Sequence, residues 1–217
     1  MMPMNKNPAT RLVSSLLLLT IVLLSGCSTN VTVNGDYPSA LTRKQPLHVG
    51  LVMDDQFSHY QFESTDDKQL PVTMALGEPQ VKLFSRVFAD MFISTTTYNS
   101  PPAKNPALDL LIVPVVEEVQ LATPFEPKLN VYEVWIKYSL KVLDGNGQPI
   151  ADWLMSSYGK TQSRFLKSDE EALNQATISA LRDAGARLVL EFHRVPEVKR
   201  WLASRQADTQ LSRSDIP

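Results

Sequence analysis

The sequence predicts a single α+β domain in which two main helices pack on one face of a mixed or antiparallel sheet of about four to six strands. Apolar residues alternate over 131–143, which is typical of a half-buried strand. Two other stretches, after Glu78 and after Ser168, carry apolar residues at helical spacing. The order of predicted elements is strand, helix, strand, strand, strand, helix.

The first strand is predicted from apolar residues at every second position, which give it one buried face. The polar stretch 54–69 follows, and strand-like pieces at 60–63 and 72–76 bracket it. We expect a hairpin or an ordered loop there, ended by Gly77. The alternating residues are Leu47, Val49, Leu51 and Met53.

The first helix is predicted to begin at Glu78 and Pro79, because proline suits an early helical position and an acid suits the positive end of the helix dipole. The β-branched run 95–97 and the proline pair 101–102 are expected to end it. Its apolar face consists of Val81, Phe84, Phe88, Met91 and Phe92.

Three strands are predicted next. The segment 108–116 is nearly all apolar, as in a central strand, but Pro114 cannot donate to a ladder and predicts a bulge or a change of pairing. The turn residues 144–147 connect the strand at 131–143 to a partner at about 150–160. The buried face of the strand at 131–143 is predicted to carry Tyr132, Val134, Ile136, Tyr138, Leu140 and Val142.

The second helix is predicted to begin at Ser168, which forms a capping box with Glu171. Its small, alanine-rich middle predicts close packing against the sheet. Pro196 starts a short further helix that carries Trp201. The buried stripe of the main helix is predicted to be Leu173, Ala176, Ala180, Leu181, Ala184, Leu188 and Phe192.

The N-terminus has the three parts of a secretory signal: basic Lys6 and Arg11, an apolar run over 12–24, and small residues before Cys27. The 13 apolar-run residues would span only about 20 Å, against roughly 30 Å of hydrocarbon in a bilayer. A comfortable membrane span is therefore not expected. An ordinary cleavable signal with an incidental cysteine and a short signal anchor are the alternatives.

The run Leu24-Ser25-Gly26-Cys27 resembles the lipobox of bacterial lipoproteins. The resemblance implies that the Cys27 thiol is diacylated, that the bond before it is cut, and that the new amino group also receives an acyl chain such as palmitate. Several acyl chains suffice for stable anchoring. Ser28, where the Gram-negative family has Asp for inner-membrane retention, implies an outer-membrane anchor and a periplasm-facing domain.

These signals divide the chain into four parts: a cleaved signal peptide over 1–26, an acylated flexible linker over 27–46, a globular domain over 47–203 and a disordered tail over 204–217. A short strand at Val31–Val33 is the alternative within the linker.

The composition argues against a nucleic-acid partner. Removal of residues 1–26 takes away two basic residues, Lys6 and Arg11, and no acid, so the formal net charge falls from −2 to −4. Because Cys27 is the only cysteine, an acylated chain has no thiol left for a disulfide or a thiolate metal site.

No catalytic residue, metal site or cofactor is predicted. Asp54, Asp55 and His59 could hold a divalent cation on one loop, but a solvated acidic loop has the same pattern. Ser157 and Lys160 match the Ser-x-x-Lys spacing of acyl-serine enzymes, yet they lie on a predicted strand, where residues three apart point to opposite faces.

Exposed aromatic residues are the candidates for binding, because interfaces use them as anchors. Trp135 comes first, since it sits on the otherwise polar face of the strand at 131–143. The alternative is that Trp135 packs under a loop or against the C-terminal segment with Trp201. The further candidates are Trp153, Tyr158, Phe125 and Tyr132.

The element order behind a lipidated N-terminus resembles small envelope lipoproteins over about residues 47–195: the LPS-assembly lipoprotein, the activators of penicillin-binding proteins, and the curli-pore and TolB N-terminal type of domain. The resemblance implies a non-enzymatic accessory or assembly factor that binds another envelope protein. One alternative is a module that binds a small lipid, glycan or peptide in a groove between the sheet and the segment 54–76. A hydrolase with an unorthodox site is the remaining one.

Overall fold

The computed structural model describes residues 29–64, 71–124, 131–162 and 168–214, so that the expected signal peptide, Cys27 and Phe125 lie outside the described residues. Its elements in chain order are β1 (Thr29–Thr32), β2 (Gln45–Val52), α2 (Asp55–Ser58), β3 (Gln61–Glu63), β4 (Val72–Ala75), α3 (Gly77–Met91), β5 (Phe92–Tyr98), β6 (Leu110–Ala122), β7 (Val131–Asp144), β8 (Pro149–Gln162), α4 (Asp169–Glu191), the 3-10 turn η1 (Phe192–Arg194) and α5 (Pro196–Ser214).

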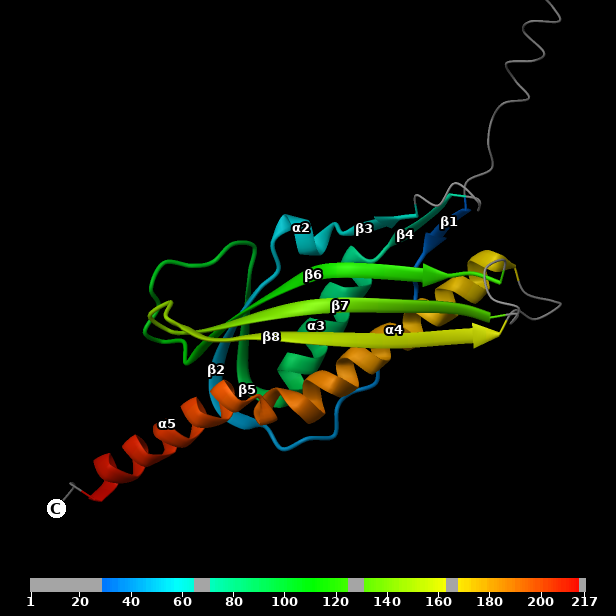
Figure 1. Ribbon diagram of the computed structural model, residues 1–217. Helices are drawn as coiled ribbons and strands as arrows, with labels where there is room; N and C mark the ends of the chain where they lie inside the picture. Colours follow the sequence, from blue (N-terminus) through cyan, green and yellow to red (C-terminus); the bar gives the residue numbers. More distant parts are fainter. Residues whose placement is uncertain (1–28, 65–70, 125–130, 163–167, 215–217) are drawn as a thin grey trace, which may run out of the picture.

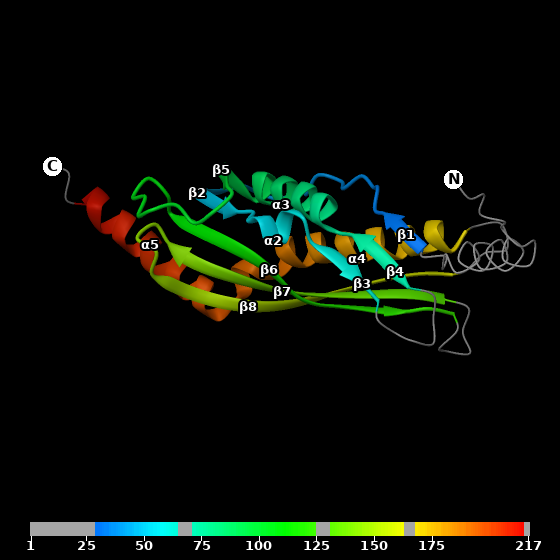
Figure 2. The same ribbon diagram turned by 90° about the horizontal axis from the view of Figure 1, so that it is seen from above.

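The predicted α+β class is confirmed. A five-stranded sheet has the order β5-β2-β6-β7-β8, and α3 and α4 cover one of its faces (Figures 1 and 2). A small second sheet has the order β1-β4-β3. β2 pairs in parallel with β5 and β6, whereas β6, β7 and β8 form an antiparallel meander. The sheet is therefore mixed, and its longest part is the meander.

Local sequence patterns correctly predicted the positions of most helices and strands. The Ser168 hydroxyl accepts from the Glu171 N–H at 3.2 Å, as the capping box predicts. In the β7–β8 turn, the Asp144 carboxylate accepts from the Asn146 N–H at 2.8 Å, and Gly147 has φ +80°, a conformation that favours glycine. Every residue predicted for the buried face of β7 and for the stripe along α4, which ends at Phe192 in η1, is buried.

Pro114 makes no bulge in β6, but the pairing of β6 changes close to it, which is the other predicted alternative. It lies opposite Leu140 in regular register, and the irregularity comes later, between Val116 and Glu118. β2 pairs with β6 only at 110–112. Past that point β6 needs hydrogen bonds on one side only, and a one-sided strand tolerates proline.

Aromatic side chains fill the space between α3 and the sheet. Phe84 lies with its ring centroid 5.3 Å from that of Phe57 and 5.2 Å from that of Tyr138. Phe57 comes from α2, within the segment 54–76 that we expected to border a ligand groove. The described part of that segment packs onto the core instead, and β3 and β4 pair as the predicted hairpin.

β5 is a strand that sequence reasoning missed. The threonine run at 95–97 was expected only to end the preceding helix, but β5 follows α3 without a loop and pairs with β2 at the edge of the sheet. Both roles have one cause, because β-branched side chains disfavour a helix and suit an extended strand.

The segment expected as a flexible linker belongs to the domain from residue 29 onward. β1 pairs with β4, and Val31, Val33 and Tyr37 are buried. The strand alternative at 31–33 is thus close to what forms. The next stretch, residues 37–41, lies over the contact between α3 and α4, where the Ala40 N–H donates to Asp90 at 2.8 Å, and is called the strap below. The polar composition concealed these few apolar side chains, because they show no lasting periodicity.

The C-terminal boundary also differs from the expectation. α5 continues to Ser214, past the predicted end of order at 203, and projects from the rest of the domain (Figure 1). Val198 anchors its first turns and is fully buried. Arg205 pairs with Asp109 and lies over the Trp201 ring at 5.3 Å from its centroid.

Candidate functional site

The face of β6, β7 and β8 that points away from α3 and α4 is covered by no described helix (Figure 2), and it carries the first predicted binding residue. Trp135 lies opposite Tyr158 in the β7–β8 register, and their ring centroids are 5.2 Å apart. Alternation along β7 therefore does put Trp135 on the helix-free face. We call this surface the open face.

Tyr158 is held in place beside Trp135. Its hydroxyl donates to Glu133 Oε1 at 2.6 Å. This hydrogen bond, together with desolvation and the negative charge of Glu133, raises the pKa of Tyr158 to about 12. At neutral pH the phenol is uncharged and keeps this hydrogen bond, which orients the Tyr158 ring beside Trp135. We call the two rings the aromatic ledge.

A shallow depression of about 140 Å³ lies next to this ledge. Its rim is polar, and Gln120 donates through Nε2 to Glu118 Oε1 at 2.6 Å. Such a mixture of aromatic and hydrogen-bonding groups suits the side chains of a protein partner. The lining residues are Glu118, Gln120, Trp135, Ile136, Lys137 and Ser156.

Charges on the open face are balanced across the strands. Glu118 lies opposite Lys137, and Glu133 lies opposite Lys160. The surface also includes Leu154, which is 59% exposed. It is therefore amphiphilic without a strong field of either sign, which does not suit a polyanion such as nucleic acid.

The remaining aromatic candidates lie elsewhere. Trp153 faces the helices, opposite Leu140, with its ring centroid 6.3 Å from that of Phe192. Tyr132 is buried on the same side, and its hydroxyl donates to Asp169. The structure thus brings Trp135 and Tyr158 together and separates both from Trp153 and Tyr132.

Sequence reasoning missed the polar rim of the depression. Gln120 and Ser156 have unremarkable types and no motif, and only strand register brings them beside Trp135. A register shift between Val142 and Leu143 alters the pairing that the β7–β8 turn alone would give. The available signal was alternation, which assigns each residue a face but not a neighbour.

Asp54 and Ser157, which come from the metal and catalytic candidate sets, make hydrogen bonds within the fold. Asp54 caps α2 and accepts from the Phe57 N–H at 2.8 Å. Ser157 is buried and donates to the Ile136 carbonyl at 3.2 Å, whereas exposed Lys160 lies on the open face. Within the described ranges, no group of three or more His, Cys, Asp or Glu side chains could hold a metal ion.

Solved structures resemble this domain at low sequence identity. Protein XCC0632 from Xanthomonas campestris, described as a member of family DUF330, matches with a TM-score of 0.50 and 10% identity over 84% of this chain and 99% of that chain. The two share a fold. At that identity the likeness says nothing about function.

Two further structures match more loosely. A putative lipoprotein from Caulobacter crescentus has a TM-score of 0.37 and 14% identity over 58% of this chain and 83% of that one. A minor lipoprotein from Acinetobacter baumannii has a TM-score of 0.38 and 12% identity over 69% and 92%. TM-scores of 0.37 and 0.38 are too low to establish a common fold.

No family model and no curated protein matches the sequence. Across the part of the chain that the structure describes, no helix combines the length and the hydropathy that a membrane span requires.

Proposed function

We propose that this protein is an outer-membrane-anchored lipoprotein whose periplasmic domain docks on another envelope protein through the open face, without catalysing a reaction. One observation carries the docking role: the Trp135–Tyr158 ledge stands beside a depression on a sheet face that no described helix covers. Tryptophan and tyrosine are enriched among the residues that dominate binding energy at protein interfaces.

The anchor would hold the domain close to the bilayer. Cys27 precedes β1 by only two residues, which is about 7 Å of extended chain. The expected linker would have reached about 25 Å as a random coil. Since β1 and the strap pack on the domain, a short connection limits the orientations in which the open face meets a partner.

The partner is expected to be a protein with a mixed apolar and polar surface. The open face pairs acids with bases across the strands, and its rim offers both donors and acceptors. An aromatic centre with a polar surround is the common arrangement of interfaces between soluble domains.

Photocrosslinking in cells tests the docking role. A benzoylphenylalanine at Ser156 or Gln120, both exposed beside Trp135, should trap one defined partner. The same probe at Lys199, exposed on α5, should not. Trp135→Ala should reduce the Ser156 adduct, whereas Trp201→Ala, a matched change on α5, should leave it. Absence of an adduct at both open-face positions would refute the docking role.

The anchor is tested separately. Mass spectrometry of the mature N-terminus should find an acylated Cys27 as the first residue, and sucrose-gradient fractionation should place the protein with outer-membrane markers. Cys27→Ala should release it from the membrane. An unmodified thiol, a retained leader or co-migration with the inner membrane would each contradict part of the proposal.

A further inference from the structure

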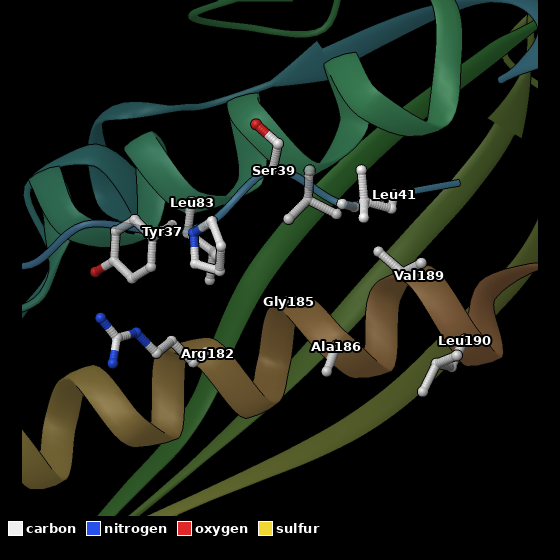
Figure 3. A pocket seen from close by; sticks show the side chains of 12 residues that line it. Tyr37, Ser39, Leu41, Leu83, Arg182, Gly185, Ala186, Val189 and Leu190 are labelled. Carbon is white, nitrogen blue, oxygen red and sulfur yellow. The ribbon is translucent and has the colours of Figure 1, made fainter. Parts of the chain in front are cut away.

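A groove of about 340 Å³ lies where the strap crosses between α3 and α4, on the helix layer rather than on the sheet (Figure 3). We call it the strap groove. Its volume falls at the lower end of the range for small-molecule sites. Its walls on the two helices are aliphatic and come from Leu83, Val87, Gly185, Ala186, Val189 and Leu190.

Positive charge is concentrated at one end of the groove. Arg182 is the one charged residue among the described residues that line it. Its guanidinium donates to the Asp36 backbone carbonyl at 3.0 Å and has no carboxylate partner among the described side chains. The Asp36 carboxylate instead lies 3.5 Å from Lys82 Nζ, and Asp90 accepts from the Ala40 N–H at 2.8 Å. Arg182 is therefore available to an anion.

A second polar group at that end has no partner. Tyr37 is 4% exposed, and within the described residues its hydroxyl makes no hydrogen bond. Burial raises the pKa of Tyr37 to about 12, and the positive charge of Arg182 opposes the rise. The hydroxyl is thus a protonated, unused donor, which is costly in a buried position. Figure 3 shows it on the same side as the Arg182 guanidinium.

The opposite end of the groove is apolar and open. Leu41 is fully exposed, at 103%, and Leu190 is 56% exposed. Both line the groove, and Figure 3 shows them with Val189 away from the Tyr37 end. The groove therefore passes from a cationic, hydrogen-bonding end to an aliphatic end, which is the polarity of an anionic amphiphile.

We propose that the strap groove binds a long-chain fatty carboxylate. Its carboxylate accepts hydrogen bonds from Arg182 and Tyr37, and its alkyl chain lies along the aliphatic walls and covers Leu41 and Leu190. A peptide fits less well, because its backbone N–H and C=O groups would face walls that cannot hydrogen-bond.

Isothermal titration calorimetry with laurate tests this site. The protein is the chain from residue 27 with Cys27→Ala, which keeps every described residue and removes its own acyl groups. We expect one laurate per chain and no saturable heat from dodecyltrimethylammonium, which has the same chain length and the opposite charge. Arg182→Gln should weaken laurate binding about tenfold or more, whereas Arg200→Gln on α5 should not.

The apolar end is tested with exposed residues, whose replacement leaves the fold intact. The double change Leu41→Gln and Leu190→Gln should weaken laurate binding about tenfold. Leu154→Gln, at a leucine on the open face that is about as exposed as Leu190, should have no effect. Equal thermal unfolding midpoints across the set would exclude misfolding as the cause.

The proposal is wrong if laurate gives no saturable heat. It is equally wrong if laurate and dodecyltrimethylammonium bind with the same affinity, both to the parent protein and to the Arg182→Gln variant. It is also wrong if sedimentation velocity shows a dimer that the Leu41 and Leu190 changes dissociate, because the groove would then hold a second copy. Trp135→Ala should leave laurate binding unchanged, so the groove and the docking surface succeed or fail separately.

Discussion

The two faces of the β7–β8 hairpin are built from alternate residues of the same strands, yet they differ in packing and in exposure to solvent. On the helix face, Gly159 lies so near α4 that a Cβ on it would stand 2.2 Å from the Ala176 carbonyl oxygen. On the open face, the Trp135 and Tyr158 rings contact each other at an interplanar angle of 38°, beside a shallow depression. Neighbouring residues of one strand therefore differ in surroundings: those on the helix face pack against α4, and those on the open face remain partly exposed.

The largest effect is expected from Gly159→Ala. The added methyl would overlap the backbone of α4 at Ala176 and Ala180, and backbone moves less readily than a side chain. We expect a loss of about 3 kcal/mol or more in the free energy of unfolding, measured by urea denaturation.

Ser156→Ala is the matched control, because Ser156 is three residues away on the same strand and exposed on the open face. Its cost should stay within about 0.5 kcal/mol. If both variants unfolded at the same urea concentration, the close approach of β8 to α4 would be incorrect.

The two tryptophans of the hairpin should separate stability from docking. Trp153→Ala removes a half-buried ring beside Phe192 and should cost about 2 kcal/mol. Trp135→Ala removes a partly exposed ring and its contact with Tyr158, and should cost below about 1 kcal/mol. In the crosslinking yield at Ser156 the order should reverse, so that Trp135→Ala causes the larger loss and Trp153→Ala the smaller one. A larger loss of stability from Trp135→Ala would mean that this residue serves the fold.

Strand faces and the starts of the helices followed from local patterns, whereas the end of α5 and the neighbours across the molecule did not. Alternation placed Trp135 on the correct side of β7, and the capping box at Ser168 set the start of α4. The partner of Trp135 depends on a register shift at Val142, which no local pattern encodes.

The strap groove was even less accessible to sequence reasoning. Tyr37 and Arg182 are far apart in the chain, and their proximity depends on how the segment around Asp36 packs on α4. An isolated Leu41 in a polar segment was the available signal, and single exposed leucines are common in globular proteins.

A smaller contrast is expected between two tyrosines of the hairpin. The Tyr138 hydroxyl is buried and donates to Gln80 Oε1 at 3.3 Å, while Gln80 Nε2 donates to the Phe57 carbonyl at 2.6 Å. Tyr138→Phe leaves Gln80 short of a partner and should cost about 1–2 kcal/mol. Tyr158→Phe frees Glu133 to bind water and should cost below about 0.5 kcal/mol in the same urea titration. Equal costs would remove the distinction between a buried network and a surface one.

The smallest effect, and one of opposite sign, is expected at Tyr37. Its buried hydroxyl has no partner in the described part of the chain, so Tyr37→Phe should leave stability at neutral pH unchanged or raise it by up to about 1 kcal/mol. The same substitution should weaken laurate binding. If the Tyr37 hydroxyl lowers stability yet supports laurate binding, then the strap groove, like the open face, would serve binding rather than the stability of the core.

The pH dependence gives this last prediction its sharpest form. Burial raises the pKa of Tyr37 from 10.0 to about 12, so the folded state holds the phenol proton more tightly than the unfolded state. The associated stabilisation is complete below pH 10.0 and is lost as the pH rises toward about 12. Tyr37→Phe should therefore make the fall in stability over that interval less steep. An identical slope in both proteins would mean that the Tyr37 hydroxyl is exposed to water, and the polar end of the strap groove would then lose its donor.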